Sequence, residues 1–157
     1  MSEPGRSADV RLATWADRAA VAALRHAWTE ERDGHHIEDD GFLARFDAWL
    51  EREQDQRLTW LGFVAHEPAG MLNMLVFTRM PRPGHLDPSV WGYVANVYVA
   101  PAHRGTGLGT RMLEACTTYA DEHGFVRIVL SPTERSIPLY VRAGFGPATE
   151  LIVRERP

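Results

Sequence analysis

The chain has 157 residues, of which 45% are hydrophobic and 24% charged, and its formal net charge is −4. These values predict one soluble globular domain over residues 1–157 and argue against nucleic acid as the main partner. The single cysteine, Cys116, excludes an internal disulfide and predicts a cytoplasmic protein, and no apolar run is long enough to span a membrane. The sequence contains no lysine, which excludes lysine Schiff-base chemistry and a nucleotidase phosphate loop.

The first half of the chain predicts a strand, two helices and a hairpin. Thr14 suits the N-cap of the first helix, and the segment after that helix has no apolar period. The expected elements are a strand at 10–13, a helix at about 15–28, a loop at 29–40, a second helix capped by Asp40, and strands at 58–65 and 71–78 joined by a turn at 67–70.

The second half predicts three more strands and two helices. Residues 80–89 hold three prolines and a glycine, which indicates an irregular connection. The expected elements are a strand at 91–99, a helix from Leu108 to Gly124, a strand at 126–130, a turn at 131–136, a short helix to Ala143 and a last strand at 150–153. This order is typical of a mixed α/β domain around one central sheet.

Three glycines, Gly105, Gly107 and Gly109, stand where the long helix is expected to begin. Glycines leave the backbone N–H groups uncovered, and the positive end of the helix dipole lies there too, so a diphosphate suits the site. The dinucleotide fingerprint G-x-G-x-x-G fails because Thr110 replaces its third glycine and because several strands precede the turn. The alternative is that these glycines serve only a tight strand–helix turn.

A strand ending in Val99-x-Pro101 and followed by Arg104-x-x-Gly107-x-Gly109 resembles the acetyl-coenzyme A (acetyl-CoA) signature of the GNAT acetyltransferase superfamily. The order of the predicted elements also fits, so the resemblance covers nearly the whole chain. It implies a GNAT-like fold, mixed α/β, with a mostly antiparallel central sheet of six to seven strands flanked by about four helices.

A second motif, Leu139-Tyr140 followed by Gly144-Phe145, is similar to the Leu-Tyr-x-x-x-Gly-Phe block of the same family. The resemblance implies that Tyr140 is the catalytic acid, which protonates the departing coenzyme thiolate. The alternative is a packed tyrosine whose hydroxyl is satisfied by the backbone.

The resemblance also implies which residues hold acetyl-CoA. The backbone of one strand would pair with the pantetheine arm, and the N–H groups of the glycine turn would hold the diphosphate. Thr133 stands where the family often has asparagine and Ser136 where alanine is common, and both keep a hydroxyl. The full set is Val97, Tyr98, Val99, Arg104, Gly105, Thr106, Gly107, Leu108, Gly109, Thr110, Thr133 and Ser136.

The implied function is an N-acetyltransferase that moves the acetyl group of acetyl-CoA to a primary amine of a small molecule or peptide. The attack would be direct, in a ternary complex, with no metal and no covalent enzyme intermediate. The alternative is a non-catalytic acyl-CoA sensor with the same fold. Domains of this kind often pair through edge strands, so a homodimer and a monomer both stay open.

The general base and the acceptor are not fixed by the sequence. Neither central strand contains a carboxylate, and the candidates in the 29–40 segment are Glu30, Glu31, His35 and His36. That segment holds six carboxylates, which would attract a cationic amine such as a polyamine, an aminoglycoside or a peptide amino terminus. The alternative is a solubilising loop.

Overall fold

A computed structural model describes residues 8–148 and 150–156 and shows one five-stranded sheet in the order β1-β2-β3-β4-β5. Neighbouring strands are antiparallel except for the parallel pair β4 and β5. The elements are β1 (Ala8–Leu12), α1 (Arg18–Asp33), α2 (Phe42–Glu53), β2 (Arg57–Val64), β3 (Glu67–Thr78), β4 (Val90–Val99), α3 (Leu108–Glu122), β5 (Ile128–Leu130) and α4 (Ile137–Arg142), with short 3₁₀ turns at Trp15–Asp17, Gln54–Gln56, Pro101–His103 and Glu134–Ser136. The expected mixed, mostly antiparallel fold is confirmed, although the described residues form five strands rather than six to seven.

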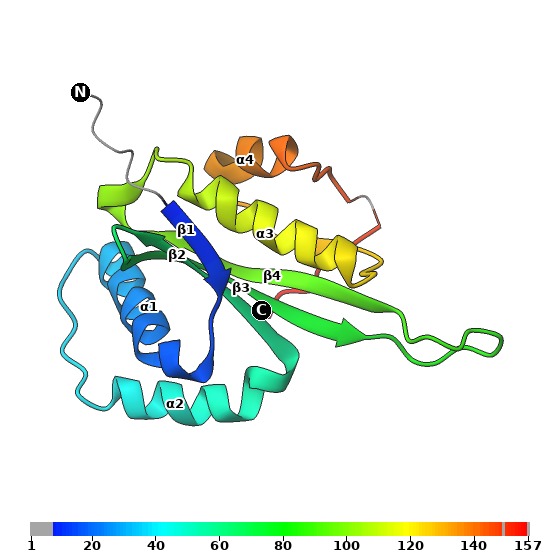
Figure 1. Cartoon of the computed structure of the whole chain (residues 1–157), viewed down its shortest axis with the longest axis horizontal. Coiled ribbons are helices and arrows are strands. Elements are labelled where there is room, and N and C mark those ends of the chain that lie inside the picture. The colour runs from blue at the N-terminus through cyan, green and yellow to red at the C-terminus, as the bar shows by residue number, and fades with distance from the viewer. Residues whose placement is uncertain (1–7, 149, 157) are drawn as a thin grey trace.

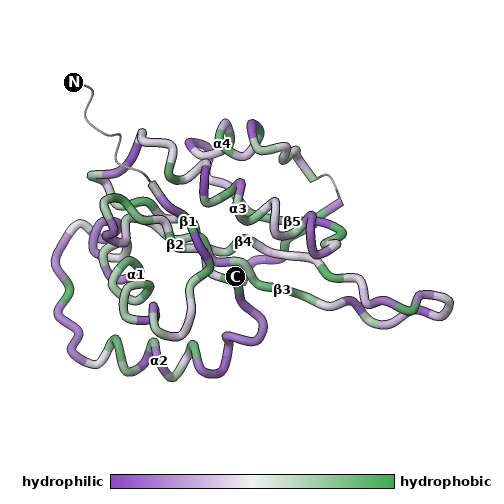
Figure 2. Tube along the Cα trace, viewed as in Figure 1, coloured by the Kyte–Doolittle hydropathy of each residue, from purple (hydrophilic) through white to green (hydrophobic). Residues whose placement is uncertain are grey.

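The two faces of the sheet are covered by different helices, α1 and α2 on one side and α3 and α4 on the other (Figure 1). Side chains alternate between the faces along each strand, and β2, β3 and β4 contribute to the cores on both faces. The larger core lies under α3 and includes Trp60, Leu72, Met74, Met112 and Cys116. The smaller core lies under α1 and includes Leu24, Leu61, Met71 and Tyr98. Hydrophobic residues follow the strands, whereas the α1–α2 connection is mostly hydrophilic (Figure 2).

Helix α1 is longer than the sequence predicted, because it continues through the first part of the expected loop to Asp33. Glutamate and arginine are good helix formers, so the helix can persist where its apolar period has ended. Gly34 ends it in the left-handed conformation (φ 76°) and donates its N–H to the carbonyl of Glu30 at 2.8 Å. The predicted Asp40 cap is also wrong, since Gly41 holds the N-cap of α2 and no side chain caps that helix.

The β2–β3 hairpin turns at Ala65 and His66 rather than at the predicted 67–70 segment, which belongs to β3. Both turn residues have positive φ, 51° and 67°, as a tight two-residue hairpin turn requires. Neither is glycine or asparagine, so the usual signal is missing. Glycine serves a different purpose at Gly70, where a Cβ would lie 2.8 Å from the carbonyl oxygen of Tyr98 on β4.

Two strand predictions near the C-terminus differ from the structure. The strand expected at 126–130 is regular only from Ile128 to Leu130. The strand expected at 150–153 is not formed, and residues 151–156 have no regular structure and are exposed. High β-propensity does not make a strand without a neighbouring edge to pair with. Among the described residues, no helix is both long enough and apolar enough to span a membrane.

Candidate functional site

Strands β4 and β5 separate at the point where the site begins. Their parallel pairing covers only three residue pairs, from Gly92 with Ile128 to Val94 with Leu130. Strand β4 continues to Val99, so its outer edge from Ala95 onward has no neighbouring strand in the part of the chain that the structure describes. An exposed strand edge of this kind can pair with an extended ligand through backbone hydrogen bonds.

The register between β3 and β4 shifts at the same point. Asn73 lies opposite Asn96 and Met74 lies opposite Val94, so Ala95 has no partner on β3. A bulge turns the backbone and places two consecutive side chains on one side of the sheet. Ala95 and Asn96 accordingly both line the cavity on the α1–α2 side. The irregularity therefore joins the open edge of β4 to that cavity.

The glycine turn presents a row of free N–H groups. Gly105 and Gly107 have φ of 76° and 85°, and α3 begins at Leu108. The first helical bond runs from the N–H of Arg111 to the carbonyl of Gly107 at 3.0 Å, and within residues 8–148 and 150–156 the six N–H groups of 105–110 have no backbone acceptor. Consecutive free N–H groups at the positive end of a helix form an anion site.

The side chains around this turn hold its shape. The Thr106 hydroxyl donates to the carbonyl of His103 at 2.6 Å. A Cβ on Gly109 would touch Val99 and Leu139, at 3.7 and 4.0 Å from their side-chain carbons, so the strand end, the helix start and α4 pack closely here. Leu108 is buried under the sheet and fixes the first turn of α3.

Arg104 is engaged within the protein. Its guanidinium forms a bidentate pair with Glu31 at 2.7 and 2.9 Å, and its Nε donates to the carbonyl of Val99 at 3.0 Å. Tyr98 also donates its hydroxyl to Glu31, at 3.2 Å. The hydrogen bond from Arg104 is the main cause that lowers the pKa of Glu31, which makes this base candidate a weak base. Through these contacts Arg104, Glu31 and Tyr98 connect the end of α1 to the end of β4.

Tyr140 lies in the second turn of α4 and is only 9% exposed. Its ring packs edge-on against Phe145 with the centroids 5.8 Å apart, and Gly144 has a positive φ (91°) that brings Phe145 back to it. Among the described residues nothing forms a hydrogen bond with the Tyr140 hydroxyl. Burial raises the pKa of this phenol above its ordinary value, so the hydroxyl stays protonated at neutral pH.

Thr133 and Ser136 lie together before α4 and bond to each other. The Thr133 hydroxyl donates to Ser136 Oγ at 3.0 Å, and Ser136 donates to the carbonyl of Thr133 at 2.9 Å. Both hydroxyl groups therefore donate their hydrogen bonds within this turn. Cys116 is fully buried, and burial raises the pKa of its thiol to about 12, which makes it an unreactive core residue.

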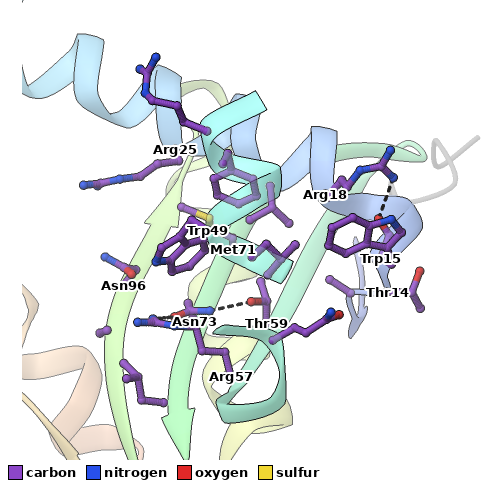
Figure 3. Close-up of a pocket in the computed structure, with 18 of the residues that line it drawn as sticks. Thr14, Trp15, Arg18, Arg25, Trp49, Arg57, Thr59, Met71, Asn73 and Asn96 are labelled. Carbon is purple, nitrogen blue, oxygen red and sulfur yellow. Dashed lines mark hydrogen bonds between the residues drawn. The ribbon is translucent and has the colours of Figure 1, made fainter. Parts of the chain in front are cut away.

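A cavity of about 760 Å³ lies on the opposite side of the sheet from α3, between the α1–α2 pair and strands β2–β4 (Figure 3). No motif in the sequence marks this cavity, because its lining comes from separate elements. Those residues are Ala13, Thr14, Trp15, Arg18, Val21, Arg25, Phe42, Arg45, Phe46, Trp49, Leu50, Gln54, Arg57, Thr59, Met71, Asn73, Leu75, Ala95 and Asn96. The volume suits a small organic molecule.

The floor of the cavity is a hydrogen-bonded chain of three side chains. Arg57 donates to the amide oxygen of Asn73 at 2.9 Å, and the Asn73 amide nitrogen donates to the Thr59 hydroxyl at 2.7 Å (Figure 3). Asn73 is 7% exposed and is the one buried polar side chain of the described core. Satisfied polar networks of this kind are rigid, so the floor is a fixed surface beside the β4 bulge.

The acidic 29–40 segment contributes no residue to the lining of this cavity. Glu30 accepts from the N–H of Ile37 at 2.9 Å and contacts His36 at 2.7 Å, while Asp39 pairs with Arg45. Among the described residues, no Asp, Glu or His lines the cavity. The structure therefore brings none of the four base candidates, Glu30, Glu31, His35 and His36, to the cavity wall. Within the described residues no group of three or more acidic, histidine or cysteine side chains could hold a metal ion.

Comparison with known proteins gives the same fold. A model of the acetyltransferase (GNAT) family matches residues 20–145. The glucosamine 6-phosphate N-acetyltransferase of Trypanosoma brucei brucei is 26% identical over 84 residues, which are 51% of this chain and 54% of that protein, so the match spans about half of the relative.

Two crystal structures match over nearly their whole length. A GCN5-related N-acetyltransferase from Ralstonia eutropha is 28% identical, with a TM-score of 0.69 over 95% of this chain and 99% of the other. A predicted acetyltransferase from Clostridium acetobutylicum, solved with acetyl-CoA, shares the fold at 18% identity, with a TM-score of 0.72 over 95% and 96% of the two chains. With the family model matching most of the chain, this protein belongs to the acetyltransferase (GNAT) family.

Proposed function

We propose that this protein is an N-acetyltransferase that moves the acetyl group of acetyl-CoA to a primary amine by direct attack in a ternary complex. One observation carries the proposal. The free N–H groups of 105–110 and the open edge of β4 lead to Ala95, where the strand bulges into the 760 Å³ cavity. A donor held along the edge and an acceptor held in the cavity would meet there.

The residues present fit the coenzyme. The N–H row and the α3 dipole suit its diphosphate, and the backbone of 97–99 suits its amide-containing arm. Arg104 remains a proposed coenzyme contact at the turn, where its guanidinium is also paired with Glu31. Thr133 and Ser136 remain proposed contacts through their hydroxyl oxygens, whose lone pairs can still accept a hydrogen bond.

The proposed step needs few protein groups. The amine nitrogen bonds to the thioester carbon and the carbon–sulfur bond breaks, while backbone N–H groups at the Ala95 bulge stabilise the negative oxygen. The Tyr140 hydroxyl gives its proton to the departing thiolate. The cavity lining contains no Asp, Glu or His, so the amine would lose its proton to water.

The acceptor class follows the cavity rather than the acidic segment. A cationic acceptor was expected from six carboxylates at 29–40, but at least Glu30, Glu31, Asp33 and Asp39 are engaged by nearby groups, and none of the six lines the cavity. The predicted single domain over 1–157, the cytoplasmic location and a homodimer stay predictions.

The second candidate is an acyl-CoA sensor without catalysis, which the absence of an acid or histidine from the cavity wall favours. Release of free thiol from acetyl-CoA over a panel of amines separates the two functions. The buried thiol of Cys116 should give little background in this assay. Amine-dependent thiol release with a matching acetylated product is expected, whereas tight coenzyme binding without thiol release from any amine would support the sensor.

A further inference from the structure

The charged side chains that line the cavity on the α1–α2 side are all cationic among the described residues. Four arginines contribute to it, Arg18, Arg25, Arg45 and Arg57, and within residues 8–148 and 150–156 no aspartate or glutamate does. The whole chain is acidic, with a formal net charge of −4. A concave surface with positively charged side chains attracts a negatively charged ligand.

Three of the four arginines already have a carboxylate partner from outside the lining. Arg18 Nε lies 3.4 Å from Asp47, Arg57 Nε lies 3.2 Å from Glu53, and Arg45 pairs with Asp39. Two of these arginines, Arg18 and Arg57, also lie over aromatic rings of the cavity wall. Arg57, for example, lies 4.7 Å from the ring centre of Trp49.

Arg25 is different. Within residues 8–148 and 150–156 it makes no ion pair, and its guanidinium lies 4.9 Å from the ring centre of Trp28. That ring in turn stacks on Tyr98 of β4, with centroids 5.6 Å apart and an angle of 13°. Arg25 comes one helical turn before Trp28, and Asn96 comes two residues before Tyr98 on the same strand face. An arginine without an acidic partner among the described residues therefore lines the same cavity as Ala95 and Asn96 at the β4 bulge.

We infer that the acceptor amine carries an anionic group, a carboxylate or a phosphate, which Arg25 binds while the amine reaches Ala95 and Asn96. This inference rests on the proposed function and names its substrate class. The guanidinium offers two parallel N–H donors that match the oxygens of either group. Apolar side chains, among them Trp49 and Met71, line the same cavity as Arg25 (Figure 3), so the acceptor can also carry an apolar or ring-shaped part.

The test uses matched pairs of amines that differ in the anionic group. Glucosamine 6-phosphate is compared with glucosamine, and phenylalanine with 2-phenylethylamine, by thiol release at saturating acetyl-CoA. We expect the anionic member of at least one pair to have a kcat/KM at least about 10-fold higher, since hydrogen bonds to charged groups have roughly this strength. The pair that shows the preference identifies phosphate or carboxylate.

Variants then assign the preference to Arg25. Arg25→Gln should raise the KM for the anionic acceptor about 10-fold, and it should leave the KM for the matched amine without the anionic group and the KM for acetyl-CoA nearly unchanged. Arg25→Lys should retain most of the preference. Arg32→Gln is the matched control, because Arg32 lies on the same helix, is 63% exposed and pairs with Asp33 outside the cavity.

Calorimetry of the same four compounds on coenzyme-saturated protein keeps the two proposals separate. Anion-selective binding that Arg25→Gln weakens, but without turnover, would support the inference and contradict the proposed function. Turnover with equal or better use of the amines that lack the anionic group, or a preference that Arg25→Gln leaves intact, would overturn the inference and leave the proposed function standing. Neither binding nor turnover would overturn both.

Discussion

The coenzyme half and the acceptor half of the proposed site differ in how the chain builds them. The coenzyme half is nearly one continuous stretch, from the bulge at Ala95 to the first turn of α3, with Tyr140 added from α4. The acceptor cavity takes its lining from α1, α2 and three strands, and from turns between them. Backbone groups dominate the first half, and side chains dominate the second.

This difference determines what a change in sequence can do. An anion site made of successive N–H groups depends on backbone conformation, so glycine positions control it and most side chains around it can vary. A cavity lined by separate elements changes with each side chain that faces it. We therefore expect substitutions in the coenzyme half to affect coenzyme binding or chemistry for all acceptors. Substitutions in the cavity should affect the choice of acceptor.

The largest expected effect is on turnover, from Tyr140→Phe. Loss of a general acid should lower kcat by about 100-fold while the Kd for acetyl-CoA changes little. The fold should tolerate the change, because the hydroxyl has no hydrogen-bond partner within the described residues. Burial raises the pKa of Tyr140, so the acid form persists as pH rises and the wild-type advantage should be constant from about pH 7 to 9 and disappear only above about pH 10. Rate–pH profiles of both proteins measure this.

Tyr119→Phe is the control for that experiment. Tyr119 lies on α3, where its ring packs against Trp60 and Phe125, away from α4. Removal of the Tyr119 hydroxyl should leave kcat unchanged. A Tyr140→Phe protein with wild-type kcat would show that another group, or water, protonates the thiolate.

A smaller effect is expected on coenzyme affinity, from Gly107→Ala. Gly107 has φ of 85°, and a Cβ there would meet open space, so the cost to folding is backbone strain of about 1 kcal/mol. The added methyl group would stand beside the free N–H groups and should raise the Kd for acetyl-CoA about 10-fold, as measured by calorimetry.

Gly84→Ala separates strain from binding. Gly84 also has a positive φ (80°) and open space for a Cβ, but it lies in the β3–β4 connection. It should lose a similar amount of stability and keep wild-type affinity for acetyl-CoA. Equal affinities for the two variants would contradict the assignment of the diphosphate to this turn.

The smallest effect is expected on stability, from Asp17→Asn beside the acceptor cavity. Asp17 accepts hydrogen bonds from Arg11 at 2.8 and 2.9 Å and from the N–H of Thr14 at 2.8 Å, and the Arg11 bonds are the main cause of its strongly lowered pKa. The variant should lose about 1–2 kcal/mol at neutral pH.

The pH dependence of that loss has a defined sign. A carboxylate with a lowered pKa in the folded state stabilises the fold above its ordinary pKa of about 4, and this contribution decreases as pH falls below that value. Urea unfolding of both proteins at neutral pH and at about pH 3 should show the difference shrinking. Asp33→Asn, which removes an exposed pair with Arg32, should cost at most about 0.5 kcal/mol at either pH. A constant difference between Asp17→Asn and the wild type across pH would contradict the mechanism.

Much of the fold could be predicted from the sequence where local preference and tertiary structure agree. Helix α3 is an example, because its apolar face and its glycine start are both visible in the chain. Prediction was wrong where the secondary structure of a segment depends on its tertiary contacts rather than on its own residues. Residues 150–153 have the composition of a strand but form none, and residues 29–33 lack an apolar period but extend α1.

By itself, the sequence determined the mixed α/β fold, the glycine turn and the place of Tyr140, because these features rest on backbone conformation and on neighbours within a few turns. Only the tertiary structure decided how the charged side chains are paired and which of them line the cavity. It paired Glu31 with Arg104, left the carboxylates of the 29–40 segment out of the cavity lining, and left Arg25 without an acidic partner among the described residues. The physical reason is that ion pairs and cavities join residues far apart in the chain, and their geometry exists only once the helices have packed on the sheet.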